Sequence, residues 1–169
     1  MKIAVSLDKD GMLPDRFGKL SPESLRRGGI NFRSFPIAIS DVPAGAKSLA
    51  LSFVDFDSIP VCGFAWIHWA ACDIDPATTL VPENASHSGE FPFTQGSNSC
   101  TSRADETSEE VIRGYIGPCP PDKDHTYTLT VYALDCELGL KSGFLFNEFH
   151  WALQGHVMDK ATLNIPSRA

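Results

Sequence analysis

The sequence lacks both a membrane-spanning segment and a basic surface. No stretch approaches the roughly 18 uninterrupted apolar residues that a helix needs to cross a bilayer, so we expect no integral membrane association. Lysine and arginine total 14 against 21 aspartate and glutamate residues, and the formal net charge is −7. Because the chain has no excess of positive charge to neutralise phosphates, we expect no nucleic-acid partner and no docking to an anionic membrane.

The cysteines form no recognisable pairing pattern. There are five of them, an odd number at irregular spacing, and none belongs to a Cys-x-x-Cys motif. The apolar stretch at residues 3–7 is too short for the core of a signal peptide. We therefore expect reduced thiols and a cytoplasmic location.

The length favours a single domain spanning residues 1–169, because a chain of this size can bury a substantial core. Internal repeats and low-complexity blocks are both lacking. Strand-like runs dominate the remainder. The clearest lie at 48–55, 64–72 and 125–133, and weaker ones lie at 3–7, 36–40 and 157–165.

Polar residues close the apolar faces of the three clear strands. Asp55 ends the face of Leu49, Leu51 and Phe53, and His125 begins the face of Tyr127, Leu129 and Val131. In the middle run, strict alternation places Trp66, His68 and Ala70 on one face and Trp69 on the other.

Residues outside these strands are less regular. Residues 8–34 are expected to form an irregular surface segment, and residues 73–124 a long functional loop with one helical turn at 108–113. Residues 143–155 are predicted to form an amphipathic helix. Its apolar stripe comprises Leu145, Phe149, Leu153 and His156. Phe146 and Trp151 lie off this stripe, which marks them as a candidate homodimer contact.

The polar strand ends are expected to meet. Burying Asp55, His68 and His125 separately would be costly, whereas together they can satisfy one another. A carboxylate beside two imidazoles raises the imidazole pKa values. An imidazolium at the mouth of such a cluster binds an oxyanion through charge-assisted hydrogen bonds.

These motifs resemble the phosphatidylethanolamine-binding protein family, which includes the Raf kinase inhibitor proteins. The resemblance covers about residues 35–166. Its first part is the run Ser48-Leu49-Ala50-Leu51 leading to Asp55-x-Asp57, followed by Trp66-x-His68-Trp69. Its second, more specific part is Gly114-Tyr115-x-Gly117-Pro118-Cys119-Pro120-Pro121 with His125-x-Tyr127. The loop cysteine and the C-terminal Gly155-His156 are similar to the short bacterial and archaeal branch.

The resemblance implies a mostly β fold, a β-sandwich of antiparallel sheets with Greek-key connections plus about one C-terminal helix. It implies a site for phosphate, acetate or phosphorylethanolamine-like ligands, without catalysis, cofactor or metal. That site would comprise Asp55, Asp57, Trp66, His68, Gly117, Pro118, Pro120, His125 and Tyr127. Both histidines would donate to ligand oxygens, and Asp55 would orient an imidazole.

Two departures from the family pattern bear on the pocket. Phe56 replaces the proline expected between the two aspartates, and residues 100–112 form an insertion-like stretch that would rim the pocket.

Three alternative functions stay open at this point. The first is a hydrolase that uses Cys119 with His68 or His125, although flanking prolines remove a nearby N–H that an oxyanion hole could use, and no Gly-x-Ser-x-Gly elbow exists. The second is a metal site formed by Asp55, His68 and His125, with Asp57 as a further ligand. The third is regulation of a kinase or another protein partner through the same cleft.

Overall fold

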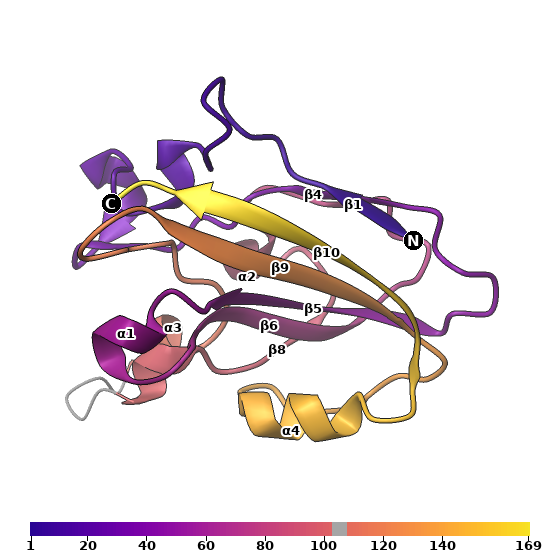
Figure 1. Cartoon of the computed structure of the whole chain (residues 1–169). Helices are drawn as coiled ribbons and strands as arrows, with labels where there is room; N and C mark the ends of the chain where they lie inside the picture. Colours follow the sequence, from indigo (N-terminus) through magenta and orange to yellow (C-terminus); the bar gives the residue numbers. More distant parts are fainter. Residues whose placement is uncertain (103–107) are drawn as a thin grey trace.

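Two antiparallel sheets packed face to face enclose the main hydrophobic core in this computed structural model, which describes residues 1–102 and 108–169 (Figure 1). The larger sheet has the strand order β10-β9-β5-β6-β8. Its strands are β5 (Ser48–Asp55), β6 (Trp66–Ile74), β8 (Thr94–Gln95), β9 (His125–Leu134) and β10 (Val157–Ser167). The smaller sheet contains β1 (Lys2–Ala4), β4 (Ile37–Ser40) and β7 (Leu80–Val81). A separate ladder pairs β2 (Arg26–Arg27) with β3 (Ile30–Asn31).

The strand order of the larger sheet is that of a Greek key. Strands β5, β6 and β8 lie in chain order across the sheet, with β7 of the smaller sheet between β6 and β8 in the sequence, and β9 then returns to lie on the other side of β5. This spatial order, fourth-first-second-third, defines the motif. The predicted mostly β fold with antiparallel Greek-key pairing is therefore confirmed.

The core between the sheets is built from the alternating faces that the sequence predicted. Leu49, Leu51 and Phe53 of β5 pack with Ile37 and Ile39 of β4. A smaller cluster lies on the opposite face of the larger sheet and includes Ala50, Cys72, Phe144, Phe149 and Leu153. Strand β5 is buried along its whole length because both of its faces are covered.

Strand β6 departs from the alternation expected for it. His68 lies in ring contact with Phe53 and Tyr127, while Trp69 packs in the same core against Tyr115. Both side chains therefore point to one side of the sheet, and the prediction that they lie on opposite faces was wrong. The cause is a β-bulge: Phe53 pairs with Trp69 but Val54 pairs with Ile67, so β6 holds one extra residue there.

Residues 8–34 do more than cover the surface, contrary to expectation. Leu13 and Phe17 belong to the main core and are almost fully buried. The segment is held by short turns and by hydrogen bonds to distant strands, such as that from the Leu13 amide to the Pro166 carbonyl at 2.7 Å. The segment has no hydrophobic periodicity because its backbone is irregular. Its apolar residues Leu13 and Phe17 are the points at which it contacts the core.

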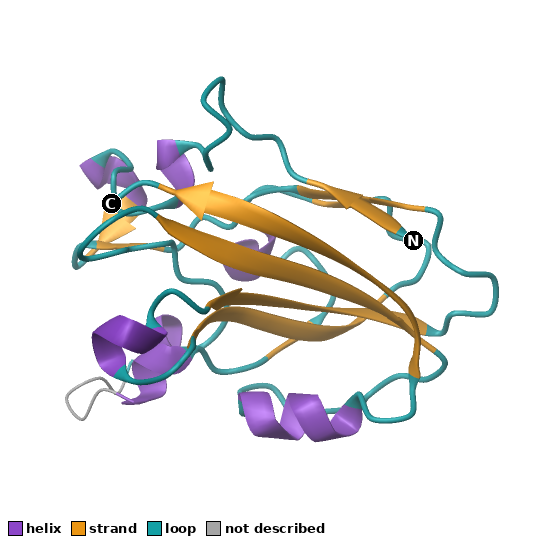
Figure 2. Ribbon diagram, viewed as in Figure 1, coloured by secondary structure: helices purple, strands orange, loops and turns teal. Residues whose placement is uncertain are grey.

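Helices are short and peripheral (Figure 2). They are α1 (Ile59–Cys62), α2 (Ala85–Ser88), α3 (Glu109–Ile112) and α4 (Phe146–Ala152). Three 3-10 turns lie at Asp15–Phe17, Glu23–Leu25 and Ser99–Ser102. Helix α3 confirms the turn expected at 108–113. Among the described residues, no helix has the length and apolar character needed to cross a membrane.

Helix α4 is shorter than the predicted 143–155 and buries a different stripe. Phe149 and Leu153 are buried as expected, whereas Leu145 is half exposed. Phe146 stacks on Phe149 and packs against the smaller core cluster, so its assignment to a free face was wrong. Trp151, 68 % exposed, does project from the helix, and its role in a homodimer stays a prediction.

Candidate functional site

A pocket of about 340 Å³ opens at the end of the larger sheet where β5 ends and β6 and β9 begin. Seven of the nine predicted site residues line it: Asp55, Trp66, His68, Gly117, Pro118, His125 and Tyr127. They converge because the antiparallel register aligns Asp55 with both Trp66 and Tyr127 across neighbouring strands. Residues more than sixty positions apart thus face one cavity.

Asp57 and Pro120 do not line the pocket. The Asp57 carboxylate is directed to the backbone instead, where it accepts a hydrogen bond from the Thr126 amide at 2.9 Å. This bond ties the turn after β5 to the start of β9. Pro120 is buried, and its carbonyl accepts a hydrogen bond from the Lys19 ammonium group. Both residues therefore hold segments that border the pocket, and their part in ligand binding stays a prediction.

His125 is held between two carboxylates. Its Nδ1 lies 2.8 Å from Asp55 Oδ2 and its Nε2 lies 2.9 Å from Asp122 Oδ1. A carboxylate only accepts hydrogen bonds, so both ring nitrogens act as donors and the ring is an imidazolium. Burial alone would lower the pKa of His125, but the hydrogen bonds and charges of Asp55 and Asp122 outweigh burial and raise it.

His68 has the opposite charge state. Its Nδ1 lies 2.9 Å from the Ile116 carbonyl oxygen, so Nδ1 carries the hydrogen. Burial lowers the pKa of His68 to about 4, so the ring is neutral at physiological pH. Its Nε2 then carries a lone pair and makes no hydrogen bond to the other described residues. The expectation that burial beside Asp55 would leave both imidazoles raised in pKa was wrong for His68, because desolvation exceeds the attraction of Asp55.

The proline-rich stretch forms a wall by packing on residues 8–34. The amide of Gly117 donates to the Asn31 carbonyl at 2.7 Å. A Cβ at Gly117 would come within 2.6 Å of the Phe17 carbonyl oxygen, so a side chain there would push the two segments apart.

Burial raises the pKa of Tyr127, which keeps its hydroxyl protonated in the pocket.

Several lining residues were not predicted, and most come from segments that sequence patterns describe poorly. Lys19, Ile30 and Asn31 enter from residues 8–34, and Val61 and Cys62 enter from helix α1. Cys100 and Ile116 continue the wall beside Trp66. Cys100 belongs to the insertion-like stretch 100–112, whose residues 103–107 lie outside the described part of the chain.

Asp122 was also missed, although it contacts His125 directly. It lies three residues before His125 in an exposed loop, and its carboxylate is half exposed. A charged residue next to two prolines is typical of a solvated turn. The contact of Asp122 with His125 depends on how the loop folds back onto the pocket. The sequence offered no signal for it beyond this proximity.

The two catalytic alternatives find little support in the geometry. Cys119 lines the pocket, but within residues 1–102 and 108–169 no hydrogen bond joins its thiol to an imidazole. The nitrogens of His125 are both engaged with carboxylates. The metal alternative requires converging donors, and among the same residues the convergence is that of Asp135, Cys136 and His156, at the opposite end of β9 from His125.

Comparison with known proteins agrees with this architecture. A family model described as phosphatidylethanolamine-binding protein matches residues 5–167. The chain belongs to the phosphatidylethanolamine-binding protein family. The resemblance drawn from the motifs, including the bacterial and archaeal branch, is thereby confirmed.

Relatives of this family with similar sequences come from bacteria and archaea. The uncharacterised protein YxkA of Bacillus subtilis is 44% identical over 165 residues, which cover 97% of this chain and 98% of YxkA. A UPF0098 protein of Methanothermobacter thermautotrophicus is 35% identical over 130 residues, 76% of this chain and 78% of its own length.

Solved structures of family members share the fold. A phosphatidylethanolamine-binding protein homologue from Chlamydia trachomatis, CT736, superposes with a TM-score of 0.77 at 29% identity over 99% of this chain and 97% of its own. Escherichia coli YbcL, described as a member of the mammalian family, gives a TM-score of 0.77 at 22% identity, covering 99% of this chain and 98% of its own. At that identity YbcL supports the fold alone.

Proposed function

We propose that this family member binds a small oxyanion, such as phosphate, acetate or a phosphorylethanolamine-like headgroup, in the pocket at the end of the larger sheet, and that it does so without catalysis. The pocket walls are mainly apolar, with Ile30, Val61, Trp66, Ile116 and Pro118 among them. Charged hydrogen bonds are stronger in such surroundings than in water.

The observation that carries this proposal is the contact between His125 and Asp122. The His125 imidazolium already binds one carboxylate that enters from an exposed loop, at 2.9 Å. A carboxylate from an exposed side chain is exchangeable, whereas that of Asp55 is buried. Nε2 of His125 is thus an oxyanion-binding group, and a ligand oxygen would take the place of Asp122.

Two further groups suit an oxyanion. Lys19 lines the same wall and carries a positive charge. Nε2 of His68 accepts a hydrogen bond from a protonated ligand oxygen, or takes up a proton and then donates to an ionised one. In this scheme His125 donates to a ligand oxygen only after Asp122 has been displaced from Nε2. His68 donates only after its Nε2 has taken up a proton.

Calorimetric titration tests the proposal. Inorganic phosphate and O-phosphorylethanolamine are titrated into the wild type and into His125→Gln, which retains a donor for Asp55 but has no charge. We expect saturable binding with one anion per chain in the wild type and at least about tenfold weaker binding in the variant, as the loss of a charged hydrogen bond implies.

The same titration separates the possible failures. Circular dichroism of His125→Gln shows whether the variant is folded, and His68→Ala is measured alongside it as a second pocket variant. Binding that is equally strong in both folded variants would place the anion elsewhere. The lack of binding in the folded wild type would exclude the proposed function and favour a protein partner, including a kinase, as the occupant of the cleft.

Asp122→Asn should strengthen anion binding. The change removes the negative charge that competes for His125 Nε2 and keeps the size of the side chain. Since Asp122 is an exposed partner, we expect a gain of about two- to fivefold in phosphate affinity, measured by the same calorimetry. Asp124→Asn is the matched control: Asp124 lies in the same loop and bonds the Ala169 amide instead. An equal gain in both variants would indicate a general charge effect.

A further inference from the structure

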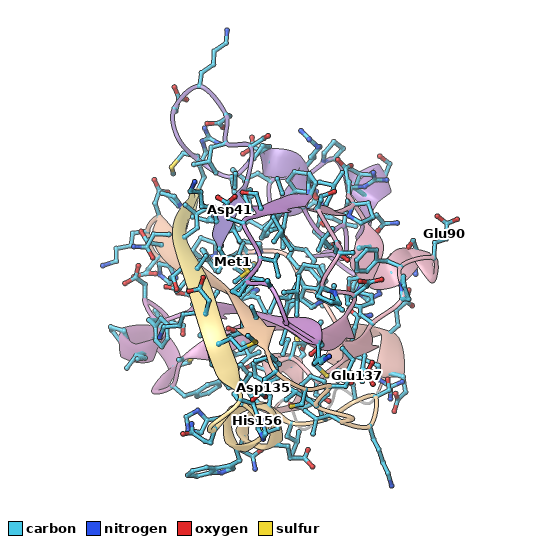
Figure 3. All side chains as sticks on the ribbon, turned by 90° about the vertical axis from the view of Figure 1, so that its right-hand side faces the viewer. Met1, Asp41, Glu90, Asp135, Glu137 and His156 are labelled. Carbon is cyan, nitrogen blue, oxygen red and sulfur yellow. The ribbon has the colours of Figure 1, made fainter. Side chains whose placement is uncertain are left out.

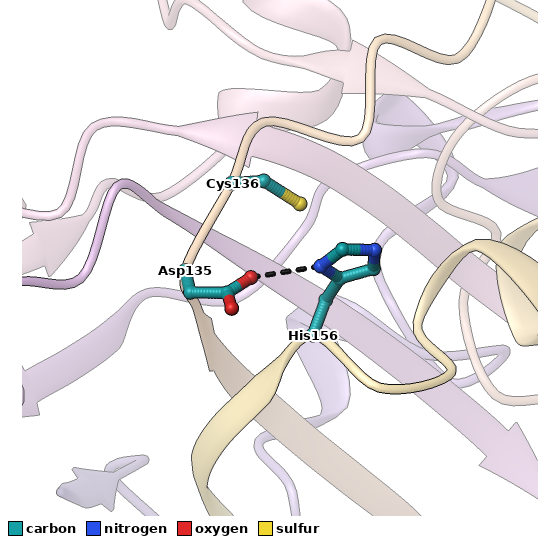
Figure 4. A group of neighbouring side chains, drawn as sticks. All are labelled: Asp135, Cys136 and His156. Carbon is teal, nitrogen blue, oxygen red and sulfur yellow. Dashed lines mark hydrogen bonds and ion pairs between the residues drawn. The ribbon is translucent and has the colours of Figure 1, made fainter.

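Three side chains with metal-binding atoms converge at the end of β9 opposite the pocket (Figure 4). Asp135 and Cys136 directly follow β9, and His156 directly precedes β10. The ten residues of β9 separate this cluster from His125 by about 30 Å. Figure 3 shows Asp135 and His156 close together at one end of the molecule, with Glu137 nearby.

The backbone fixes the positions from which these side chains extend. Leu134 pairs with Val157 in the ladder between β9 and β10, and the Asp135 amide donates to the His156 carbonyl at 3.1 Å. The Cys136 carbonyl accepts a hydrogen bond from the Ser48 hydroxyl of β5 at 2.6 Å. The cluster is therefore anchored on three adjacent strands of the larger sheet, so little reorganisation is needed to bring its donors together.

The donor atoms are spaced as a small metal ion requires. His156 Nδ1 lies 2.8 Å from Asp135 Oδ1, and the ligand atoms of all three residues lie within 4.8 Å of one another. Tetrahedral zinc with bonds of about 2.0–2.3 Å places its ligand atoms about 3.3–3.7 Å apart. Small rotations of the Asp135 and His156 side chains, each about half exposed, are enough to reach that spacing.

We propose that Asp135, Cys136 and His156 form a binding site for one divalent transition metal ion of the zinc type. A thiolate, an imidazole and a carboxylate together favour Zn²⁺ or Co²⁺ over Mg²⁺ or Ca²⁺, which prefer oxygen ligands alone. Three protein ligands leave a fourth position, which faces solvent because Asp135 and His156 are half exposed. Water or an exogenous ligand occupies it.

Charge near the cluster favours a cation. Asp73, near the end of β6, accepts a hydrogen bond from the Leu138 amide at 2.6 Å, two residues after Cys136, and adds negative charge to this end of the sheet. Metal binding releases the proton of the Cys136 thiol, since zinc binds the thiolate, and the ion takes the place of the hydrogen that His156 Nδ1 donates to Asp135.

Cobalt titration of the reduced, chelator-treated protein tests the site, because a thiolate ligand gives Co²⁺ a sulfur-to-metal charge-transfer absorption. We expect one Co²⁺ per chain with this absorption, displaced by one equivalent of Zn²⁺. Cys136→Ser should remove the absorption and weaken Zn²⁺ binding at least about tenfold. The variant leaves the Asp135–His156 hydrogen bond and the Cys136 backbone contact in place, so the fold is preserved.

Cys62→Ser is the matched control, since Cys62 is an exposed free cysteine beside the pocket. The Cys62→Ser variant should bind Co²⁺ and Zn²⁺ as the wild type does. Zn²⁺ should raise the melting temperature of the wild type and of Cys62→Ser but not that of Cys136→Ser. An absorption that persists in Cys136→Ser, or a wild type that binds neither ion saturably, would overturn the proposal.

Discussion

Asp55→Ala should lower the free energy of unfolding by about 3 kcal/mol and abolish anion binding. The Asp55 carboxylate and the His125 ring are both buried, and removing one partner of a buried charged pair leaves the other without compensation. The variant also loses the hydrogen bond that Asp55 Oδ1 accepts from the Ser58 amide at 3.2 Å. Urea denaturation measures the stability, and calorimetry with phosphate measures binding.

Asp57→Ala is the matched control for Asp55→Ala. Asp57 belongs to the same turn, but its carboxylate caps the Thr126 amide at the surface and lies outside the pocket lining. We expect Asp57→Ala to cost about 1 kcal/mol, as the loss of one ordinary hydrogen bond does, and to leave anion affinity nearly unchanged. Equal losses of stability and binding in the two variants would contradict the distinct positions of these carboxylates.

The contribution of the Asp55–His125 pair to stability also depends on pH. The folded pKa of His125 is raised above its unfolded value, so the stability that comes from its protonation is fully present below the unfolded pKa, near 6.5. It is lost as pH rises through the folded pKa. The difference in stability between wild type and Asp55→Ala should therefore narrow on the alkaline side.

Acetate affinity should fall as pH rises from 6 to 8. Acetate stays ionised throughout this range, so changes in affinity come from the protein. Burial lowers the pKa of His68 to about 4 in the ligand-free protein, and an anion bound at Nε2 raises that pKa because it favours the imidazolium. Between the free and bound pKa values binding takes up a proton, so affinity falls by up to about tenfold per pH unit.

His68→Asn separates this effect from the titration of His125. The asparagine amide can still donate to the Ile116 carbonyl, but it does not titrate. Its acetate affinity should be weaker, with only the shallower fall that accompanies loss of the His125 charge. Proton uptake is measured by calorimetry in two buffers of different ionisation enthalpy. A wild-type profile identical to that of His68→Asn would show that His68 Nε2 does not contact the anion.

The parts of the fold that sequence patterns predicted are those where local alternation decides the structure. Strands β5 and β9 have strict period-2 faces, and their polar ends did meet at one pocket. The bulge in β6 has no counterpart in the pattern, because an extra residue changes the face of His68 without changing the sequence of residue types. The family resemblance supplied the sandwich and the set of candidate ligands.

Sequence patterns could not predict the contacts between loops that are distant in the chain. The place of Lys19 in the wall depends on how residues 8–34 dock, and the competition between Asp122 and an anion depends on the path of the loop before β9. The charge state of His68 was also misjudged, because it is set by the degree of burial, which a linear sequence does not contain.

The docking of residues 8–34 on the proline-rich wall has a consequence for folding. The Tyr115 hydroxyl donates to the Phe17 carbonyl across 98 positions of the chain, and the Leu13 amide donates to the carbonyl of Pro166. Contacts between residues so far apart in the sequence form late in folding, since the entropy cost of closing a long loop must be overcome first. We therefore expect the pocket to be among the last parts of the fold to assemble, so that ligand binding reports completed folding.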